Sequence, residues 1–431
     1  ETKSLTEDAS RREQDAGTGL VSTKAVGMEL LLENAEATRK NILSGKLSGM
    51  DGETNSRTTS EAFLSAGNSY GRALSNNRTQ SLDVNVKNSF TLMKPFFVFS
   101  FSQLTYNDAD NNQQGKSGTF QANPEHLGEV EEVLNKLWAP HLSPDIAGIG
   151  VNRQMSEGIG TRRNFAVETS NYVSLKLPWG DFIRYGVDVT YSRVQNKTFS
   201  NNRFDYLQTA MAPDNRNQYD SEPRHGYTYQ IRANYDFRLG ISNWGITMAY
   251  QYRQEYNAET ALRHRLDRLN GWQAGVRSLG DLPSTRDSML LAFDLNNSYR
   301  RRQWQKRHGI GPTIYYNKDE KGRTVQFSVS FPFSFKTDRM HYQRNLIDTC
   351  IVRKSRLFQP LIFLSMSTHE GKYDYRVNLQ RTIATPDLVQ MVNLKDDVNP
   401  LAVQLGNPNL QNTINNKFSM HFEIKQPLRQ Q

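Results

Sequence analysis

Apolar and polar residues alternate along much of this chain. From Tyr227 to Leu239 every odd position is apolar and every even position is polar. Successive side chains of a β-strand point to opposite faces of its sheet, so this pattern predicts a strand with one apolar face. The same pattern recurs in seven further segments, at residues 82–92, 165–177, 183–191, 244–252, 325–336, 373–379 and 418–424. With weaker segments near residues 25–34 and 42–50, the sequence predicts an all-β fold of about 12 to 14 strands.

The predicted strands are long. Strands in soluble sheets usually have about five or six residues. A 13-residue strand reaches about 43 Å, so when tilted by about 40° it crosses the hydrocarbon layer of a membrane with residues to spare. Strand length therefore favours a transmembrane antiparallel β-barrel, which could be part of a larger barrel.

The expected connections alternate between short and long. Lys94-Pro95 and residues 178–181 and 240–243 are tight turns, whereas residues 107–162, 195–225 and 257–286 read as long loops. Outer-membrane barrels have short periplasmic turns and long extracellular loops. Helical spacing after Asn123 and after Asn257 predicts that two of these extracellular loops carry short helices. The segment 318–323 is short where the strand count expects a long connection.

A barrel assigns the two faces of each strand to lipid and to the lumen. The apolar face supplies the expected lipid-facing residues, which are Tyr229, Ile231, Tyr235, Phe237, Phe327, Val329 and Phe331. The polar face supplies the expected lumen residues, which include Arg232, Asn234, Gln326 and Ser328. Aromatic side chains near strand ends suit the membrane–water interface, and we assign Trp179, Trp244, Tyr227 and Tyr252 to it.

Composition narrows the class of protein further. The 431 residues are 36% hydrophobic, and the longest apolar runs fall far short of the roughly 20 residues that a spanning helix requires. One cysteine, Cys350, excludes a disulfide framework and cysteine-rich metal modules. The formal net charge of +9 suits phosphate-rich partners, including nucleic acid and lipid A, but is small for a chain of this size. The first residues do not have the pattern of an export signal, so we expect any such signal to lie outside this sequence.

We divide the chain into two regions. Residues 1–80 are rich in Ser, Thr and Asn with poor alternation, and are expected to be N-terminal barrel strands or a loop. Residues 81–431 are expected to form the transmembrane barrel region.

No motif for covalent chemistry is found in the structural context that it requires. Residues 67–71 match the nucleophile-elbow pattern but lack the preceding strand and following helix that such a motif needs. Residues 108–112 resemble the start of a calcium loop, but the glycine and glutamate of that loop are missing, so we favour a solvated turn there. The eight histidines lack metal-ligand spacing. We therefore expect no enzyme activity, no cofactor and no metal site. The basic run at residues 300–308 could bind phosphates, but a solvated strand end is the favoured reading.

The C-terminal third resembles a known family. It contains, in order, residues 361–366, a tight turn at 369–372, residues 373–379, 385–388 and 399–401, and a loop formed by Gly406, Asn407, Pro408, Asn409 and Leu410. This series resembles the outer-membrane β-barrel region of TonB-dependent receptor-like, SusC-like proteins, well over residues 356–424 and plausibly back to residue 81. The resemblance implies location in the outer membrane of a Gram-negative bacterium and, for such proteins, energy-coupled import of large ligands such as glycans beside a surface lipoprotein.

The sequence also departs from that family. We find in it no plug domain, no TonB box and no carboxypeptidase-like domain, so it is either part of a longer polypeptide or a diverged barrel. The first functional hypothesis is uptake of a large nutrient, such as a glycan, across the outer membrane. The alternative is a non-transporting barrel that serves as a scaffold within a multi-protein outer-membrane complex with surface lipoproteins. A soluble β-rich adhesin or nucleic-acid-binding module would account for the charge but not for the strand length. Expected partners are outer-membrane lipids and lipopolysaccharide, with a surface lipoprotein or other outer-membrane proteins, and no nucleic acid.

Overall fold

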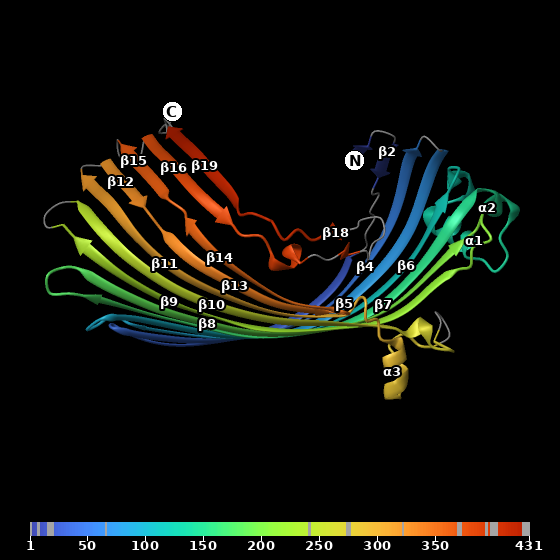
Figure 1. Ribbon diagram of the computed structural model, residues 1–431, viewed down its shortest axis with the longest axis horizontal. Coiled ribbons are helices and arrows are strands. Elements are labelled where there is room, and N and C mark those ends of the chain that lie inside the picture. The colour runs from blue at the N-terminus through green and yellow to red at the C-terminus, as the bar shows by residue number, and fades with distance from the viewer. Residues whose placement is uncertain are drawn as a thin grey trace, which may run out of the picture.

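A computed structural model describes most of the chain as one large antiparallel sheet (Figure 1). The described residues are 2–6, 9–14, 21–64, 67–239, 243–272, 277–320, 323–368, 373–392, 395–396 and 404–424. In this part of the chain 17 strands belong to the sheet, and the short pair β17 (Lys395–Asp396) and β18 (Gln404–Leu405) stands apart. The all-β antiparallel prediction is confirmed.

The strands of the large sheet follow the chain in order. They are β1 (Thr2–Thr6), β2 (Ala9–Gln14), β3 (Val21–Glu36), β4 (Arg39–Leu64), β5 (Gly67–Leu92), β6 (Phe97–Phe120), β7 (Gly150–Lys176), β8 (Phe182–Tyr206), β9 (Asp214–Arg238), β10 (Trp244–Arg265), β11 (Tyr299–Glu320), β12 (Arg323–Ser330), β13 (Phe333–Arg344), β14 (Ile347–Phe358), β15 (Leu361–Thr368), β16 (Tyr373–Ala384) and β19 (Thr413–Ile424).

Neighbouring strands pair in long unbroken registers. The ladder between β4 and β5, for example, runs from Arg39 opposite Leu92 to Leu64 opposite Gly67. Two pairs of strands lie end to end along one neighbour: β2 and β3 along β4, and β12 and β13 along β11. The 17 strands exceed the expected 12 to 14, because two long lines of chain are each divided into two strands (β12 with β13, and β14 with β15) and because β1 and β2 lie where no strand was counted.

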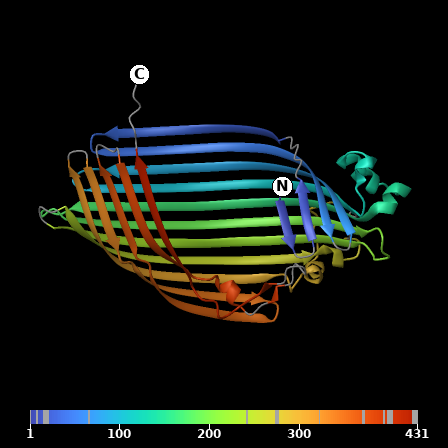
Figure 2. The ribbon, with the colours of Figure 1, turned by 90° about the horizontal axis from the view of Figure 1, so that it is seen from above.

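The sheet forms an open trough (Figure 1). The long central strands run side by side, and the strands near the two chain ends rise on opposite sides (Figure 2). Among the described residues no ladder joins β19 to β3, and each of these strands pairs along one side only.

The ladders bring the apolar positions of successive strands onto one face. Phe237 on β9 lies opposite Ile246 on β10, which lies opposite Ile314 on β11, which in turn lies opposite Val329 on β12. Other apolar side chains that share this face and are exposed to solvent include Met28, Leu30, Leu82, Val86, Leu104, Ile183, Val189, Met248, Leu364, Leu379, Phe418 and Met420.

The apolar face is the convex side of the trough. The segment that carries η3 (Leu388–Met391) packs on Met340 and Tyr342, which lie on the opposite, polar face of β13. That segment and β18 lie in the hollow of the trough (Figure 1). The polar face is therefore concave.

Three prolines lie side by side in neighbouring strands or between them, and each interrupts the hydrogen-bond ladder of the sheet. Pro312 lies in β11, Pro332 separates β12 from β13, and Pro360 separates β14 from β15. Each proline carbonyl still accepts a hydrogen bond from the next line of chain, from the backbone N–H groups of Phe331, Gln359 and Arg381 respectively. Proline has no N–H to return, so each position lacks one amide donor.

Long connections occur at one end of the strands only, as expected, but not every connection at that end is long, and the bounds differ from those expected. At one end of the strands the connections are short, including residues 93–96 and 177–181, and only two residues separate β11 from β12 at this end. At the other end, residues 121–149, 266–298 and 385–412 are long connections, whereas residues 207–213 and 345–346 are shorter and only two residues separate β4 from β5. The segment 318–323 thus lies at the end where the connections are short. The loops expected at 107–162, 195–225 and 257–286 are wrong at their edges, since β6 to β10 extend about 9 to 14 residues into them.

Helices occur only in the long connections of the described chain. They are η1 (Pro124–Leu127), α1 (Val130–Leu137), α2 (Pro144–Ile149), η2 (Leu266–Arg268), α3 (Arg286–Ala292) and η3. Asn123 caps η1 as predicted, its side chain accepting a hydrogen bond from the Glu125 N–H. The helix expected after Asn257 is wrong, because that segment continues β10, and the turn expected at residues 108–112 is wrong, because it lies inside β6.

Candidate functional site

The convex apolar face ends in aromatic residues at both its edges. At the short-turn edge, Trp244 contacts Tyr316, with ring centroids 5.0 Å apart. At the other edge a row of rings crosses three strands: Tyr227 lies 5.4 Å from Tyr256, which lies 5.3 Å from Trp304. From Tyr227 to Phe237 the strand advances about 33 Å, or about 25 Å when tilted by 40°, which matches the apolar band of transmembrane barrels.

The expected lipid-facing residues share this convex face. Tyr229, Ile231, Tyr235 and Phe237 lie on β9, Phe327 and Val329 lie on β12, and Phe331 follows β12 directly. Among the expected interface residues, Tyr227 belongs to the far aromatic row and Trp244 to the short-turn edge. Tyr252 lies inside the band, opposite Ile231, and contacts Tyr229 at 5.6 Å. Trp179 lies in a short turn, where its Nε1 donates to Asp181 over 2.9 Å.

The concave face carries the expected lumen residues. Arg232 and Asn234 alternate with the apolar residues of β9, and Gln326 and Ser328 alternate with those of β12. Arg232 forms an ion pair with Asp188 on β8 at 2.6 Å. The face is not uniformly polar, since Phe97 from β6 contacts Tyr172 from β7 there with ring centroids 6.0 Å apart.

Beyond the apolar band, the concave face is hollowed into a cleft. A cavity of about 740 Å³ adjoins one of about 280 Å³, and Arg263 and Asn297 line both. The larger cavity is also lined by Gln154, Asn202, Phe204, Tyr206, Asp214, Arg216, Gln218, Arg265, Asp294 and Asn296, and the smaller by Asp220, Glu222, Ala261, Leu262, Tyr299, Arg301, Tyr342, Arg344 and Val389. We take this cleft as the candidate functional site.

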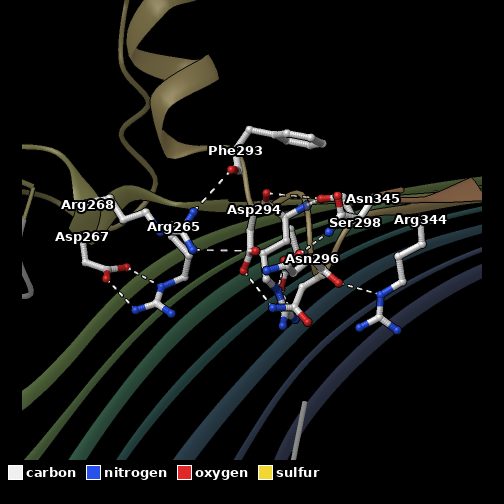
Figure 3. Close-up of polar contacts among 12 residues, drawn as sticks. Arg265, Asp267, Arg268, Phe293, Asp294, Asn296, Ser298, Arg344 and Asn345 are labelled. Carbon is white, nitrogen blue, oxygen red and sulfur yellow. Dashed lines mark hydrogen bonds and ion pairs between the residues drawn. The ribbon is translucent and has the colours of Figure 1, made fainter. Parts of the chain in front are cut away.

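Paired charges hold the walls of the cleft in place. Arg263 donates two hydrogen bonds to Asp220, at 2.8 and 3.1 Å, and this pairing raises the pKa of Arg263. Arg265 makes the same fork to Asp267, at 2.9 and 2.7 Å (Figure 3). Such bidentate pairs fix both side chains in one orientation.

The connection between α3 and β11 closes one side of the cleft. Asp294 accepts a hydrogen bond from the Asn297 amide at 2.9 Å, and its backbone N–H donates to the Arg263 carbonyl. Arg344, from the end of β13, donates to the Asn296 carbonyl at 2.6 Å (Figure 3). The connection is thus tied to β10 through the Arg263 carbonyl and to β13 through the Arg344 side chain.

Glu259 is the centre of a second polar cluster at the cleft. It is 8% exposed, and it accepts from the Tyr299 hydroxyl at 2.9 Å and from Arg301 at 2.5 Å, while Arg224 lies 3.0 Å away. Burial, together with the hydrogen bond to Glu259, raises the pKa of Tyr299 to about 12. Tyr299 therefore stays a neutral hydrogen-bond donor at any physiological pH.

The loop that suggested the family resemblance also lies on the concave side. The Asn407 N–H donates to the Gln390 carbonyl at 2.7 Å, and a side chain on Gly406 would overlap the Val392 carbonyl. Asn407 caps the following turn through the Asn409 N–H, and Pro408 and Leu410 complete it. Arg353 on β14 donates to the Leu410 carbonyl at 3.2 Å and to Asn412 at 2.7 Å, which fixes the loop to the sheet. The companion segments 369–372 and 399–401 lie outside the described residues.

The connection after β10 packs on the convex side through His264. Its ring lies 5.7 Å from Tyr219 and 5.5 Å from Phe293, and its Nδ1 has no hydrogen-bond partner among the described residues. Burial lowers the pKa of His264. The same histidine in the unfolded chain has a pKa near 6.5, so it is protonated at a higher pH than the packed His264 ring. Packing of the connection 266–298 is therefore most stable above pH 6.5 and weakens as the pH falls below that value.

We therefore expect residues 266–298 to become more accessible to protease between pH 7.5 and pH 5.0. A His264→Phe variant keeps a ring between Tyr219 and Phe293 but has no proton to gain, so its cleavage rate should stay constant over this range. Equal pH dependence in the variant and the parent protein would exclude His264 as the cause.

Sequence reasoning did not find the cleft. Its lining residues on β8, β9 and β10 fall in segments that lack alternation and were expected to be loops. Among the described residues no helix is long and apolar enough to cross a membrane. No group of His, Cys, Asp and Glu suited to a metal ion occurs in that same part of the chain.

Comparison with known proteins gives no family. No protein-family model matches the sequence, and no curated protein matches it significantly. The resemblance to TonB-dependent receptor-like proteins stays a prediction from the C-terminal motifs.

Proposed function

We propose that this chain forms the wall of an outer-membrane β-barrel of the TonB-dependent receptor-like class, in a Gram-negative bacterium, and serves the uptake of a large nutrient such as a glycan. One observation carries the membrane location. The exposed apolar side chains gather on one face in a band about 25 Å tall, bounded by aromatic rows. Exposed apolar area of this extent is rare on soluble monomers.

The cleft supports a polyhydroxylated ligand. Its lining combines arginine and asparagine donors with aspartate acceptors, and Phe204 and Tyr206 add aromatic faces. Sugar hydroxyls both donate and accept hydrogen bonds, so this lining offers them partners of both kinds. Because its arginines and aspartates offset one another, the ligand does not need to be charged. The position of the cleft, on the concave face beyond the apolar band, suits capture of a ligand before it enters the barrel.

Open strand edges bear on how the barrel would close. An unpaired backbone edge in hydrocarbon costs several kcal/mol for each unsatisfied group. β3 and β19 each pair on one side in the described chain, so further strands are needed beside them in a membrane.

Liposome swelling tests the transport proposal. Phosphatidylcholine vesicles that contain the purified protein should admit dextran fragments up to a size limit, and protein-free vesicles should exclude them. The protein should first float with these vesicles through a density gradient. A protein that fails to float contradicts the membrane location, and one that floats without admitting any fragment contradicts transport.

A scaffold is the second candidate, and α3 favours it. Leu290 and Leu291 on this short helix are 62% and 71% exposed, and the helix projects from the sheet (Figure 1). An exposed apolar pair of this kind suits a protein partner such as a surface lipoprotein. Extraction in mild detergent separates the two functions: co-purification of several proteins whose loss leaves growth on large nutrients unchanged would favour the scaffold.

A further inference from the structure

The basic run at residues 300–308 is divided between the two faces of the sheet. Because β11 is a regular strand, Arg301 and Arg307 lie on the concave face, partly buried, while Arg300, Arg302 and Lys306 lie exposed on the convex face. The convex set is the part available to an outside partner.

Two further strands extend the convex set. Lys306 lies opposite Thr337 on β13, which lies opposite Lys354 on β14, and Arg339 lies opposite Trp304. Side chains in adjacent strands are about 5 Å apart at the Cβ atoms, so Lys306 and Lys354, which are separated by one strand, lie about 10 Å apart at the Cβ atoms and can both reach one ligand. We call this surface the basic patch, and its members are Arg300, Arg302, Lys306, Arg339, Lys354 and Arg356.

No member of the basic patch has an ion pair within the described chain. On the concave face, in contrast, Arg232, Arg263 and Arg301 are each paired with a carboxylate. The acidic side chain at the edge of the patch, Asp348, already accepts hydrogen bonds from His341 and Gln343 at 2.6 and 2.9 Å. The patch is therefore a concentrated positive surface whose countercharge must come from outside the described chain.

The patch begins where the apolar band ends. Arg356 lies opposite Phe335, the last apolar residue of β13 on this face, and the Arg339 guanidinium lies 5.8 Å over the ring of Trp304 in the far aromatic row. Aromatic rows in barrels mark the level of the lipid headgroups. The charges of the patch are thus at the height of headgroup phosphates.

We propose that the basic patch binds the phosphate groups of anionic membrane lipids, such as the diphosphorylated glycolipid lipid A. The proposal rests on the membrane location proposed above. Lysine and arginine near a membrane surface are each attracted to anionic headgroups. A phosphate placed between β11 and β14 would be within reach of Lys306, Lys354 and Arg339 together.

The test is a titration of the purified protein with lipid A in neutral detergent, followed by native mass spectrometry. Lys306→Gln with Lys354→Gln should weaken binding of lipid A roughly tenfold. The control, Lys46→Gln with Lys87→Gln, removes two exposed lysines from the concave face and should leave binding unchanged. Dephosphorylated lipid A should bind more weakly than lipid A, and with the same affinity to the parent protein and to both variants.

Three outcomes would overturn the proposal. These are equal affinity in the patch variant and the parent protein, equal losses in the two variants, and full competition by millimolar inorganic phosphate, which would indicate a site for free phosphate. Flotation with phosphatidylcholine vesicles is measured on the same variants, so that failure of membrane insertion is recognised separately from failure of lipid A binding.

Discussion

Replacing Val329 with arginine is expected to lower the free energy of unfolding in a bilayer by about 2 to 4 kcal/mol. Val329 lies between Ile314 on β11 and Ile362 on β15, in the apolar band of the convex face. A charge at this depth would have to leave water for hydrocarbon. Urea unfolding of the protein from phosphatidylcholine vesicles, followed by tryptophan fluorescence, measures the loss.

The matched control is the neighbouring residue. Ser328→Arg introduces the same side chain one position away, on the concave face, where it meets water in a barrel. We expect that variant to lose much less stability than Val329→Arg. Equal losses at the two positions would contradict the orientation of the sheet proposed here.

Replacing Glu259 with alanine is expected to lower the free energy of unfolding by about 2 to 3 kcal/mol. The buried carboxylate accepts from Tyr299 and Arg301, and without it both donors lose their partner in a poorly solvated place. The expected loss of stability is smaller than for a fully buried ion pair, because Arg224, the third partner of Glu259, is half exposed.

Glu259→Gln separates the hydrogen bonds from the charge. The amide oxygen still accepts from Tyr299, so this variant should retain more stability than Glu259→Ala. Both variants should keep the apolar band and float with vesicles. Unchanged stability of Glu259→Ala would show that the cluster does not hold the cleft together.

The sequence predicts the strands best where the two faces differ. Within the apolar band, β9 from Tyr227 onward places apolar side chains on the convex face and polar side chains on the concave face, so the residue types follow period two. The shared apolar surface of β9 and β12 could be predicted this way, whereas the cap at Asn123 could be predicted from an asparagine that precedes proline and helical spacing.

The outer parts of the long strands could not be predicted, because the alternation of apolar and polar residues disappears beyond the apolar band. In the first half of β9, residues such as Arg216 and Asp220 lie on a strand that is polar on both faces, so hydropathy does not distinguish it from a loop. Its strand identity comes from the backbone ladders to β8 and β10, which the one-dimensional pattern does not contain. The cleft was missed for the same reason, since it is built from these segments. Membrane location and transport stay predictions.

The prolines at 312, 332 and 360 have a consequence for the shape of the wall. They form a crease: along it the sheet lacks three amide donors, so bending there sacrifices fewer hydrogen bonds than bending elsewhere. Gly311 fits this crease, because a Cβ atom at its position would lie 3.1 Å from the Pro332 Cα. Beyond it, β12, β15, β16 and β19 turn away from the direction of the long strands (Figure 2). The crease thereby lets one sheet serve as both the floor and a side of the trough.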